Sequence, residues 1–229
     1  MKDMVLKGWR WSAPCLLIMA GILVYAWLNL PEGDLLPVHW NAMGEADKFW
    51  PRDKAYLMLA VPFFGSIGVS VLLSVLPKLD PRGENLVKSR KMYLFTWVGT
   101  VMFMTFMLGA MTVSMMGGDI RVIIRFVLVG QCLLLIGIGN YLPKTRPNWF
   151  AGIRTPWTLS SDYVWERTHR LGGWLFVLSG LVSIPLVLFG TATWMRLAFV
   201  PLILAAVLVC AVYSYVIWRR APDRGAGQA

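Results

Sequence analysis

The richest group of chemically capable side chains lies in Asn148–Arg170, which reads NWFAGIRTPWTLSSDYVWERTHR. An amide, an arginine after Gly-Ile and a Thr-Pro-Trp-Thr turn come first, and a Trp, a Glu, a His and an Arg follow. Side chains of these types hydrogen-bond to ligands and partners. No nucleophile stands beside a base and an orienting group, as nucleophilic catalysis requires. The pattern therefore predicts a binding or structural site and no catalytic residues.

A second polar segment, LPVHWNAMGEADKFWPRDKAY, begins at Leu36 and contains the first of the two histidines, His39. A histidine can bind a metal or titrate near neutral pH. Zinc sites, however, need several convergent ligands, and one histidine among scattered carboxylates does not supply them. We therefore expect no metal and no cofactor. A folded cap with Trp40, Phe49 and Trp50 at a membrane interface is the simpler interpretation.

Long apolar blocks separate these segments. The 229 residues are 57% hydrophobic and 15% charged, with a mean hydropathy of +0.60, whereas a soluble domain carries about 25% charged residues. A membrane helix needs about 20 apolar residues, and the alternating strands of membrane barrels, about ten residues each, are absent. We expect an all-α polytopic membrane protein with six transmembrane helices, at Ala13–Leu30, Ala55–Leu76, Tyr93–Met115, Val122–Leu142, Leu171–Phe189 and Leu197–Trp218.

Lysines and arginines are unevenly distributed between the two sides of these predicted spans. With the N-terminus in the cytoplasm, 16 of the 22 lie on the cytoplasmic side, in agreement with the positive-inside rule. Both termini are then cytoplasmic. The net charge of +10 faces anionic lipid and predicts no direct nucleic-acid binding. His39 and His169 lie across a hydrocarbon core about 30 Å thick, so they cannot form one site.

The long cytoplasmic loop ends in the pattern of a helix start. A helix capped within Ser160–Asp162 would place Trp165 and His169 on one face. Glu166 and Arg170 are also four residues apart and can pair. Two interpretations stay open: a rigid loop whose tryptophans are buried at the inner interface, and a surface that binds a ligand or partner.

Polar residues inside the spans predict helix contacts. Ser66, Ser70 and Ser74 share one helix face, where small residues allow a close approach. Gln131 is expected to hydrogen-bond across helices. Arg121 and Arg125, at the outer end of the fourth span, are expected to snorkel to the lipid interface, with an anion site as the alternative.

The two polar segments resemble a known family. The segment PNWFAGIRTPWTLSSDYVWERTHRLGGWLFVLSG is similar to the C-terminal signature of SdpI-type integral membrane proteins, Asn-x-Phe/hydrophobic-Gly-Ile-Arg-Thr-Pro-Trp-Thr followed by Trp and Thr-His before a Gly-rich span. The first loop resembles the Pro-x-His-Trp/Phe-Asn-x-x-Gly-x-x-Asp element of the uncharacterised domain that commonly precedes this signature. We therefore divide the chain into an N-terminal membrane domain, 1–92, and an SdpI-like membrane domain, 93–229.

The resemblance implies a relation to immunity proteins for a secreted peptide toxin of the sporulation-delaying type. In that system the immunity protein protects the producing membrane and, when toxin-bound, recruits an autorepressor. Carried over by position, the partner- or ligand-binding residues on the outer side would be Pro37, His39, Trp40, Asn41, Gly44 and Asp47. Those on the cytoplasmic side would be Asn148, Gly152, Arg154, Thr155, Pro156, Trp157, Thr158, Trp165 and His169.

Three functional hypotheses follow. The first is a multi-pass protein of the bacterial cytoplasmic membrane that gives immunity to a membrane-active peptide and signals its presence. The second is a small transporter or lipid-handling protein, in which Gln131, Arg125 and the serine face would line a path. The third is a membrane enzyme, for which only His169 and Glu166 offer acid-base groups. We expect the protein not to be an enzyme, and we expect lipids to be its general partners.

Overall fold

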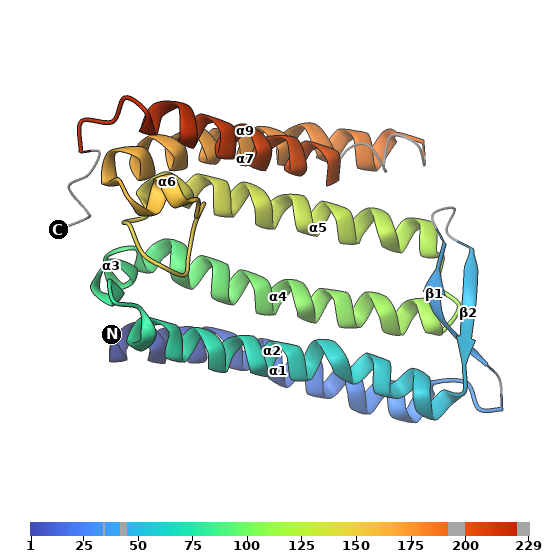
Figure 1. The fold of residues 1–229 in the computed structure, drawn as a ribbon. Helices are drawn as coiled ribbons and strands as arrows, with labels where there is room; N and C mark the ends of the chain where they lie inside the picture. Colours follow the sequence, from blue (N-terminus) through green and yellow to red (C-terminus); the bar gives the residue numbers. More distant parts are fainter. Residues whose placement is uncertain (34, 42–44, 192–199, 224–229) are drawn as a thin grey trace.

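The structure, a computed structural model, describes residues 1–33, 35–41, 45–191 and 200–223. Within these ranges six helices are long and apolar enough to cross a membrane, which confirms the predicted class. They are α1 (Lys2–Asn29), α2 (Arg52–Leu79), α4 (Arg90–Met115), α5 (Ile120–Tyr141), α7 (Asp162–Phe189) and α9 (Val200–Trp218) (Figure 1). The first residues of the sixth predicted span lie outside the described ranges.

Two boundaries differ clearly from the prediction: α1 begins at Lys2 rather than at Ala13, and α7 begins at Asp162 rather than at Leu171. The helix that starts after Ser161 was expected to belong to the loop, but it runs without a break into the fifth span and forms the single helix α7. Ser161 caps it by accepting a hydrogen bond from the amide of Val164. Because no glycine or proline interrupts the first two turns, the polar segment simply continues into the apolar one.

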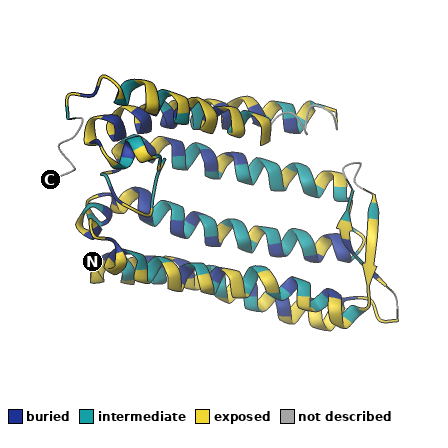
Figure 2. Ribbon diagram, in the orientation of Figure 1, coloured by how far each residue is buried: buried dark blue, intermediate teal, exposed yellow. Residues whose placement is uncertain are grey.

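The six helices form two groups. α1, α2 and α4 pack against one another, α7 contacts both α5 and α9, and α4 and α5 join the two groups. Figure 1 shows α4 between the α1–α2 pair and α5. The outward faces are rich in exposed residues (Figure 2), among them large apolar side chains such as Phe64, Trp174 and Leu208. Such faces suit a hydrocarbon environment.

The connections between helices alternate between the two ends of the bundle (Figure 1). One end carries an antiparallel hairpin of β1 (Leu36–Trp40) and β2 (Ala46–Trp50), which the sequence did not predict. Leu36 and Val38 alternate along β1 and are buried against residues of α1, α2 and α4, and this period of two favours a strand.

The other end carries the N-terminus and the last described residues (Figure 1). The short elements α3 (Gly83–Lys88), η1 (Leu142–Lys144) and α6 (Pro156–Leu159) also lie there. The cytoplasmic location of the termini remains a prediction.

The serine face of α2 accepts hydrogen bonds from aromatic side chains of its neighbours. The indole nitrogen of Trp97 donates to Ser70 at 3.1 Å, and that of Trp9 donates to Ser74 at 2.7 Å. Ser66 donates within its own helix, to the carbonyl of Pro62. Two of the three predicted contacts are therefore indole–hydroxyl bonds between helices rather than a close approach of two backbones.

Arg125 does not extend toward lipid as predicted. Its guanidinium donates to the carbonyl oxygens of Leu188, at 2.8 Å, and Gly190, at 3.4 Å. The last carbonyls of a helix have no partner within the helix, and a cation there is favoured by the helix dipole. Arg125 thus stabilises the end of α7 and ties it to α5.

Candidate functional site

The long loop between α5 and α7 begins with a turn organised by one amide side chain. Asn148 is 1% exposed. Its Nδ2 donates to the carbonyls of Arg146 and Ala151, and its Oδ1 accepts from the amides of Phe150 and Ala151. These four bonds use the full capacity of the amide, so Asn148 shapes the loop and has no free group for a ligand.

His169 is the centre of the folded loop. Its Nε2 lies 2.9 Å from the amide nitrogen of Ile153, and its Nδ1 lies 2.8 Å from the carbonyl oxygen of Trp165. The amide must donate and the carbonyl must accept, so the ring is neutral and carries its proton on Nδ1. Both nitrogens are engaged and the side chain is fully buried, so His169 is not placed to transfer protons.

The predicted shared face of Trp165 and His169 is confirmed. The two rings stack with centroids 4.0 Å apart. The indole nitrogen of Trp165 also donates to the carbonyl of Thr145, at 3.1 Å. The pair therefore connects the first turns of α7 to both arms of the loop. The predicted bond between Glu166 and Arg170 is present as well, at 3.2 Å on the exposed face.

Gly152 is required by this packing. Its φ of +114° lies in a region that L side chains rarely adopt, and an added Cβ would stand 2.3 Å from Nε2 of His169. A glycine thus allows the backbone to pass close to Nε2 of the imidazole.

The Thr-Pro-Trp-Thr turn forms a capped single turn, α6, that contacts α9. The side chains and amides of Thr155 and Thr158 bond reciprocally as a capping box, with Pro156 at the first helical position. Thr155 also lies 3.0 Å from the hydroxyl of Ser214, and Trp157 packs on Tyr215. The motif is therefore a docking element for the last helix.

The loop is tied to the first half of the chain by residues that sequence reasoning missed. Asp80 accepts from the amide of Trp149 at 3.0 Å, Asn85 donates to the carbonyl of Pro147 at 2.8 Å, and Ser89 accepts from the amide of Arg146 at 2.8 Å. Asp80 and Ser89 are buried. Small polar side chains in a short basic loop were the available signal, but the pattern did not name their partners.

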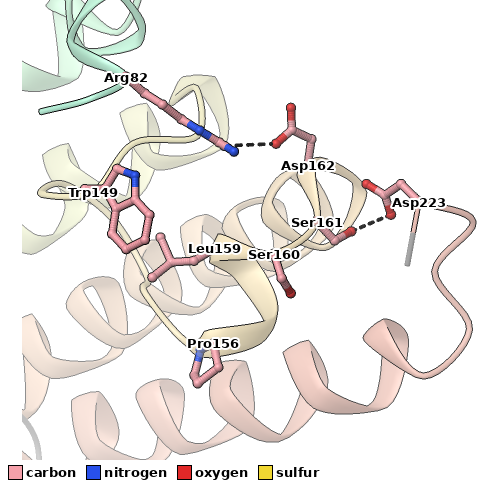
Figure 3. A pocket seen from close by; sticks show the side chains of 8 residues that line it. All are labelled: Arg82, Trp149, Pro156, Leu159, Ser160, Ser161, Asp162 and Asp223. Carbon is pink, nitrogen blue, oxygen red and sulfur yellow. Dashed lines mark hydrogen bonds and ion pairs between the residues drawn. The ribbon is translucent and has the colours of Figure 1, made fainter. Parts of the chain in front are cut away.

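Arg154 is one of two exposed motif residues in the loop, together with Pro156. Its guanidinium donates to the carbonyl of Trp149 at 2.9 Å, which leaves other N–H groups directed toward solvent. A pocket of about 670 Å³ lies nearby and is lined by Arg82, Trp149, Pro156, Leu159, Ser160, Ser161, Asp162 and Asp223 (Figure 3).

The outer motif lies at the opposite end of the bundle, on the hairpin (Figure 1). Nδ1 of His39 lies 2.5 Å from Oδ1 of Asp47, and both side chains are exposed. Asn41 and Glu45 are joined across the strand ends by two hydrogen bonds that involve the Asn41 side chain and by one between their backbones. Trp40 is half-buried, and Gly44 lies outside the described residues.

Comparison with known proteins identifies a family and a similar protein. Residues 144–214 match the SdpI/YfhL protein family. The predicted resemblance to the SdpI family is confirmed. This SdpI segment begins at the last residue of η1 and ends within α9. The chain is also 23% identical over 207 residues to the immunity protein SdpI of Bacillus subtilis (strain 168), covering 90% of this chain and 92% of that protein. No solved structure gives a significant match.

The SdpI match contains every position of the second predicted motif, from Asn148 to His169. The structure brings these residues together around one loop, where most of them bond to each other or to neighbouring helices. The resemblance of the first loop to the preceding domain, and the division at residue 92, remain predictions. In the structure α4 contacts α1 and α2 on one side and α5 on the other.

The contacts between helices do not support the polar path that a transporter would need. Ser70 and Ser74 on α2 are occupied by indole donors, and Arg125 on α5 is engaged by carbonyls of α7. α2 packs on α1 and α4, whereas α5 packs on α4 and α7. These polar groups therefore belong to separate helix interfaces.

Proposed function

We propose that this protein is an immunity protein of the bacterial cytoplasmic membrane that protects its own cell against a secreted, membrane-active peptide toxin. The observation that carries the proposal is the alignment with the immunity protein SdpI over 90% of this chain and 92% of that protein. Similarity over nearly the full length of both proteins favours a shared role more than a shared motif does. The six-helix architecture suits a protein that acts within a membrane.

The hairpin is the proposed point of contact with the toxin. The charge distribution orients the hairpin outward, where a secreted peptide arrives. Its second strand exposes Asp47, Lys48, Phe49 and Trp50, which offers charges of both signs beside aromatic rings. Such a surface can bind a peptide that is itself partly apolar.

The folded loop at the other end is the proposed cytoplasmic output. α7 extends from Asp162 to Phe189, and Arg125 ties its far end to α5, so a single helix connects the two membrane surfaces. Arg154 is exposed beside this helix. An autorepressor protein would dock on this face in the signalling form of the proposal.

Survival of a toxin-sensitive strain tests immunity. Cells that lack immunity of their own would express this protein or carry an empty vector, and both would be exposed to peptides of the sporulation-delaying type. We expect higher survival with the protein. No gain with any such peptide would reject toxin immunity.

Two substitutions test the loop assignment. Arg154→Ala and Trp157→Ala should lower survival without loss of membrane insertion, which is measured by membrane fractionation. Arg170→Ala is the matched control, because Arg170 is also exposed on this end but bonds only to Glu166 in its own helix. Wild-type survival for both test variants would remove the loop from the functional site.

Thiol labelling tests the orientation. A membrane-impermeant maleimide should label Lys48→Cys in intact cells and Arg170→Cys only after permeabilisation. The native thiols Cys132 and Cys210 are buried and Cys15 is partly buried, so unsubstituted protein sets the background. Labelling of both positions from the same side would overturn the assignment of toxin and repressor to opposite faces.

A further inference from the structure

The pocket at the end that carries the N-terminus combines one cation, two anions and an apolar wall (Figure 3). Arg82, from the α2–α3 turn, lies 3.3 Å from Asp162 at the start of α7. Trp149, Pro156 and Leu159 form the wall. The lining therefore comes from both halves of the chain.

Among the residues that line the pocket, the two carboxylates exceed the single guanidinium by one charge. Asp162 and Arg82 pair, whereas Asp223 accepts from the hydroxyl of Ser161 at 2.6 Å and the amide of Tyr163 at 3.2 Å. Asp223 thus already occupies the N-terminus of α7. The Asp162 side chain remains 74% exposed, so it can accept further hydrogen bonds. A net negative pocket in a strongly basic protein selects for a ligand that includes a positive group.

The lengths of the helices place this pocket at the membrane surface. α2 and α7 each contain 28 residues, which corresponds to about 42 Å at 1.5 Å per residue. A bilayer including its headgroups is about 40–45 Å thick. Asp162 is the first residue of α7, and Arg82 follows shortly after Leu79, the last residue of α2. Both side chains therefore lie at the level of lipid headgroups.

We propose that this pocket binds the phosphoethanolamine headgroup of a bilayer phospholipid. The ammonium group would lie between the carboxylate of Asp162 and the face of Trp149, which offer a charged acceptor and a cation–π contact. The phosphate would bond to the guanidinium of Arg82. Trp149 and Phe150 are both exposed beside the pocket and would contact the upper part of the acyl chains. The pocket volume of about 670 Å³ is within the range of about 300–1,000 Å³ typical of ligand sites.

Native mass spectrometry of the full chain tests this assignment. The protein in detergent would receive equal amounts of phosphatidylethanolamine, phosphatidylcholine and phosphatidylglycerol with identical acyl chains. The basic surface alone would favour the anionic phosphatidylglycerol. We expect phosphatidylethanolamine to be retained above both others. Equal retention, or a preference for phosphatidylglycerol, would overturn the proposal.

Two substitutions separate the roles of the charges. Asp162→Asn should reduce the retention of phosphatidylethanolamine by about two- to fivefold, the range expected for an exposed charge contact. It should leave the retention of phosphatidylglycerol unchanged. Arg82→Gln should reduce the retention of both lipids alike. Glu166→Gln is the matched control, because Glu166 is an exposed acid on the same helix that pairs with Arg170 outside the pocket. A loss with Glu166→Gln equal to that with Asp162→Asn would contradict the assignment.

A soluble competitor identifies the source of the headgroup. Free phosphoethanolamine lacks acyl chains and should not displace the lipid at equal concentration. If the protein retained as much free phosphoethanolamine as phosphatidylethanolamine, the pocket would be assigned to a soluble metabolite and the lipid would be rejected. No toxin enters any of these measurements, so failure here leaves the proposed immunity function untouched, and the reverse also holds.

Discussion

The two polar ends of this bundle each contain one histidine, and the two side chains are held in opposite ways. On the hairpin, His39 contacts Asp47 while the two side chains are 55% and 40% exposed. In the folded loop, His169 is fully buried, stacks on Trp165 and bonds through both ring nitrogens. A surface pair of this kind contributes about 0–1 kcal/mol, whereas breaking a buried network leaves unpaired groups that cost about 1–3 kcal/mol each.

This difference indicates which residues can bind a partner and which maintain the fold. The hairpin can rearrange its exposed pair on contact with a partner without loss of the fold. The buried part of the loop cannot, so contact with a partner has to use residues on its rim, such as Arg154 and Trp149, which are exposed. A signature motif therefore contains residues of two kinds, and burial distinguishes them.

Gly152→Ala should produce the largest loss of stability. The strained φ of +114° and the contact with His169 together predict a loss of about 2–6 kcal/mol in the free energy of unfolding. Unfolding in mixed micelles with increasing SDS measures it. Gly33→Ala is the control at the hairpin end, because Gly33 also has a positive φ, +86°, but open space around it. Equal losses would show that the packing over the imidazole adds nothing.

His169→Ala should rank second and His39→Ala well below it. Truncation of the buried ring removes its packing against Trp165 and leaves the amide of Ile153 without an acceptor, a loss of about 2–4 kcal/mol. His39→Ala should cost less than about 1 kcal/mol. The same unfolding assay compares the two variants directly. A larger loss at His39 would reverse the contrast between the two ends.

The spans were predictable because they depend on composition and length alone. Six apolar blocks predicted six helices, and the capping pattern at Ser160–Asp162 predicted the start of α7, which begins at Asp162. The pairs Trp165–His169 and Glu166–Arg170 followed from helical spacing. All of these are local inferences, in which the interacting residues are at most one turn or one span apart.

The long-range contacts were not predictable, because a single sequence does not show which segments meet. The bond between Asp80 and the amide of Trp149 joins residues 69 positions apart. The two carbonyls that Arg125 contacts lie on the next membrane helix along the chain. The hairpin was missed for another reason: burial alternates only within the five residues of β1, whereas four of the five residues of β2 are exposed, and so short a pattern gives a weak signal.

Ser70→Ala tests whether a hydrogen bond between helices inside the membrane stabilises the first half of the chain. Trp97 and Ser70 are both fully buried, so the substitution leaves an indole N–H unpaired and should cost about 1–2 kcal/mol. Ser66→Ala is the matched control on the same helix face, because Ser66 bonds only to its own backbone at Pro62 and should be nearly neutral. A neutral Ser70→Ala would show that the bond between Trp97 and Ser70 does not stabilise the packing of α4 on α2.

Asp223→Asn should have the smallest effect, confined to the start of α7. Partial burial raises the pKa of Asp223, but hydrogen bonds from Ser161 and the amide of Tyr163 outweigh it and hold the pKa below its ordinary value of 3.8. The stabilisation is therefore present above that ordinary value and is lost as the pH falls through the lower folded pKa.

Hydrogen exchange at the Tyr163 amide measures this contact. Its protection factor should fall at acidic pH in the wild type, and Asp223→Asn should lower it at neutral pH. Asp119→Asn is the control, because Asp119 accepts from the amide of Arg121 at the start of α5 and is a cap supplied from within its own helix start. It should leave Tyr163 unchanged. Unaltered protection in Asp223→Asn would mean that α7 begins without help from the segment that follows α9.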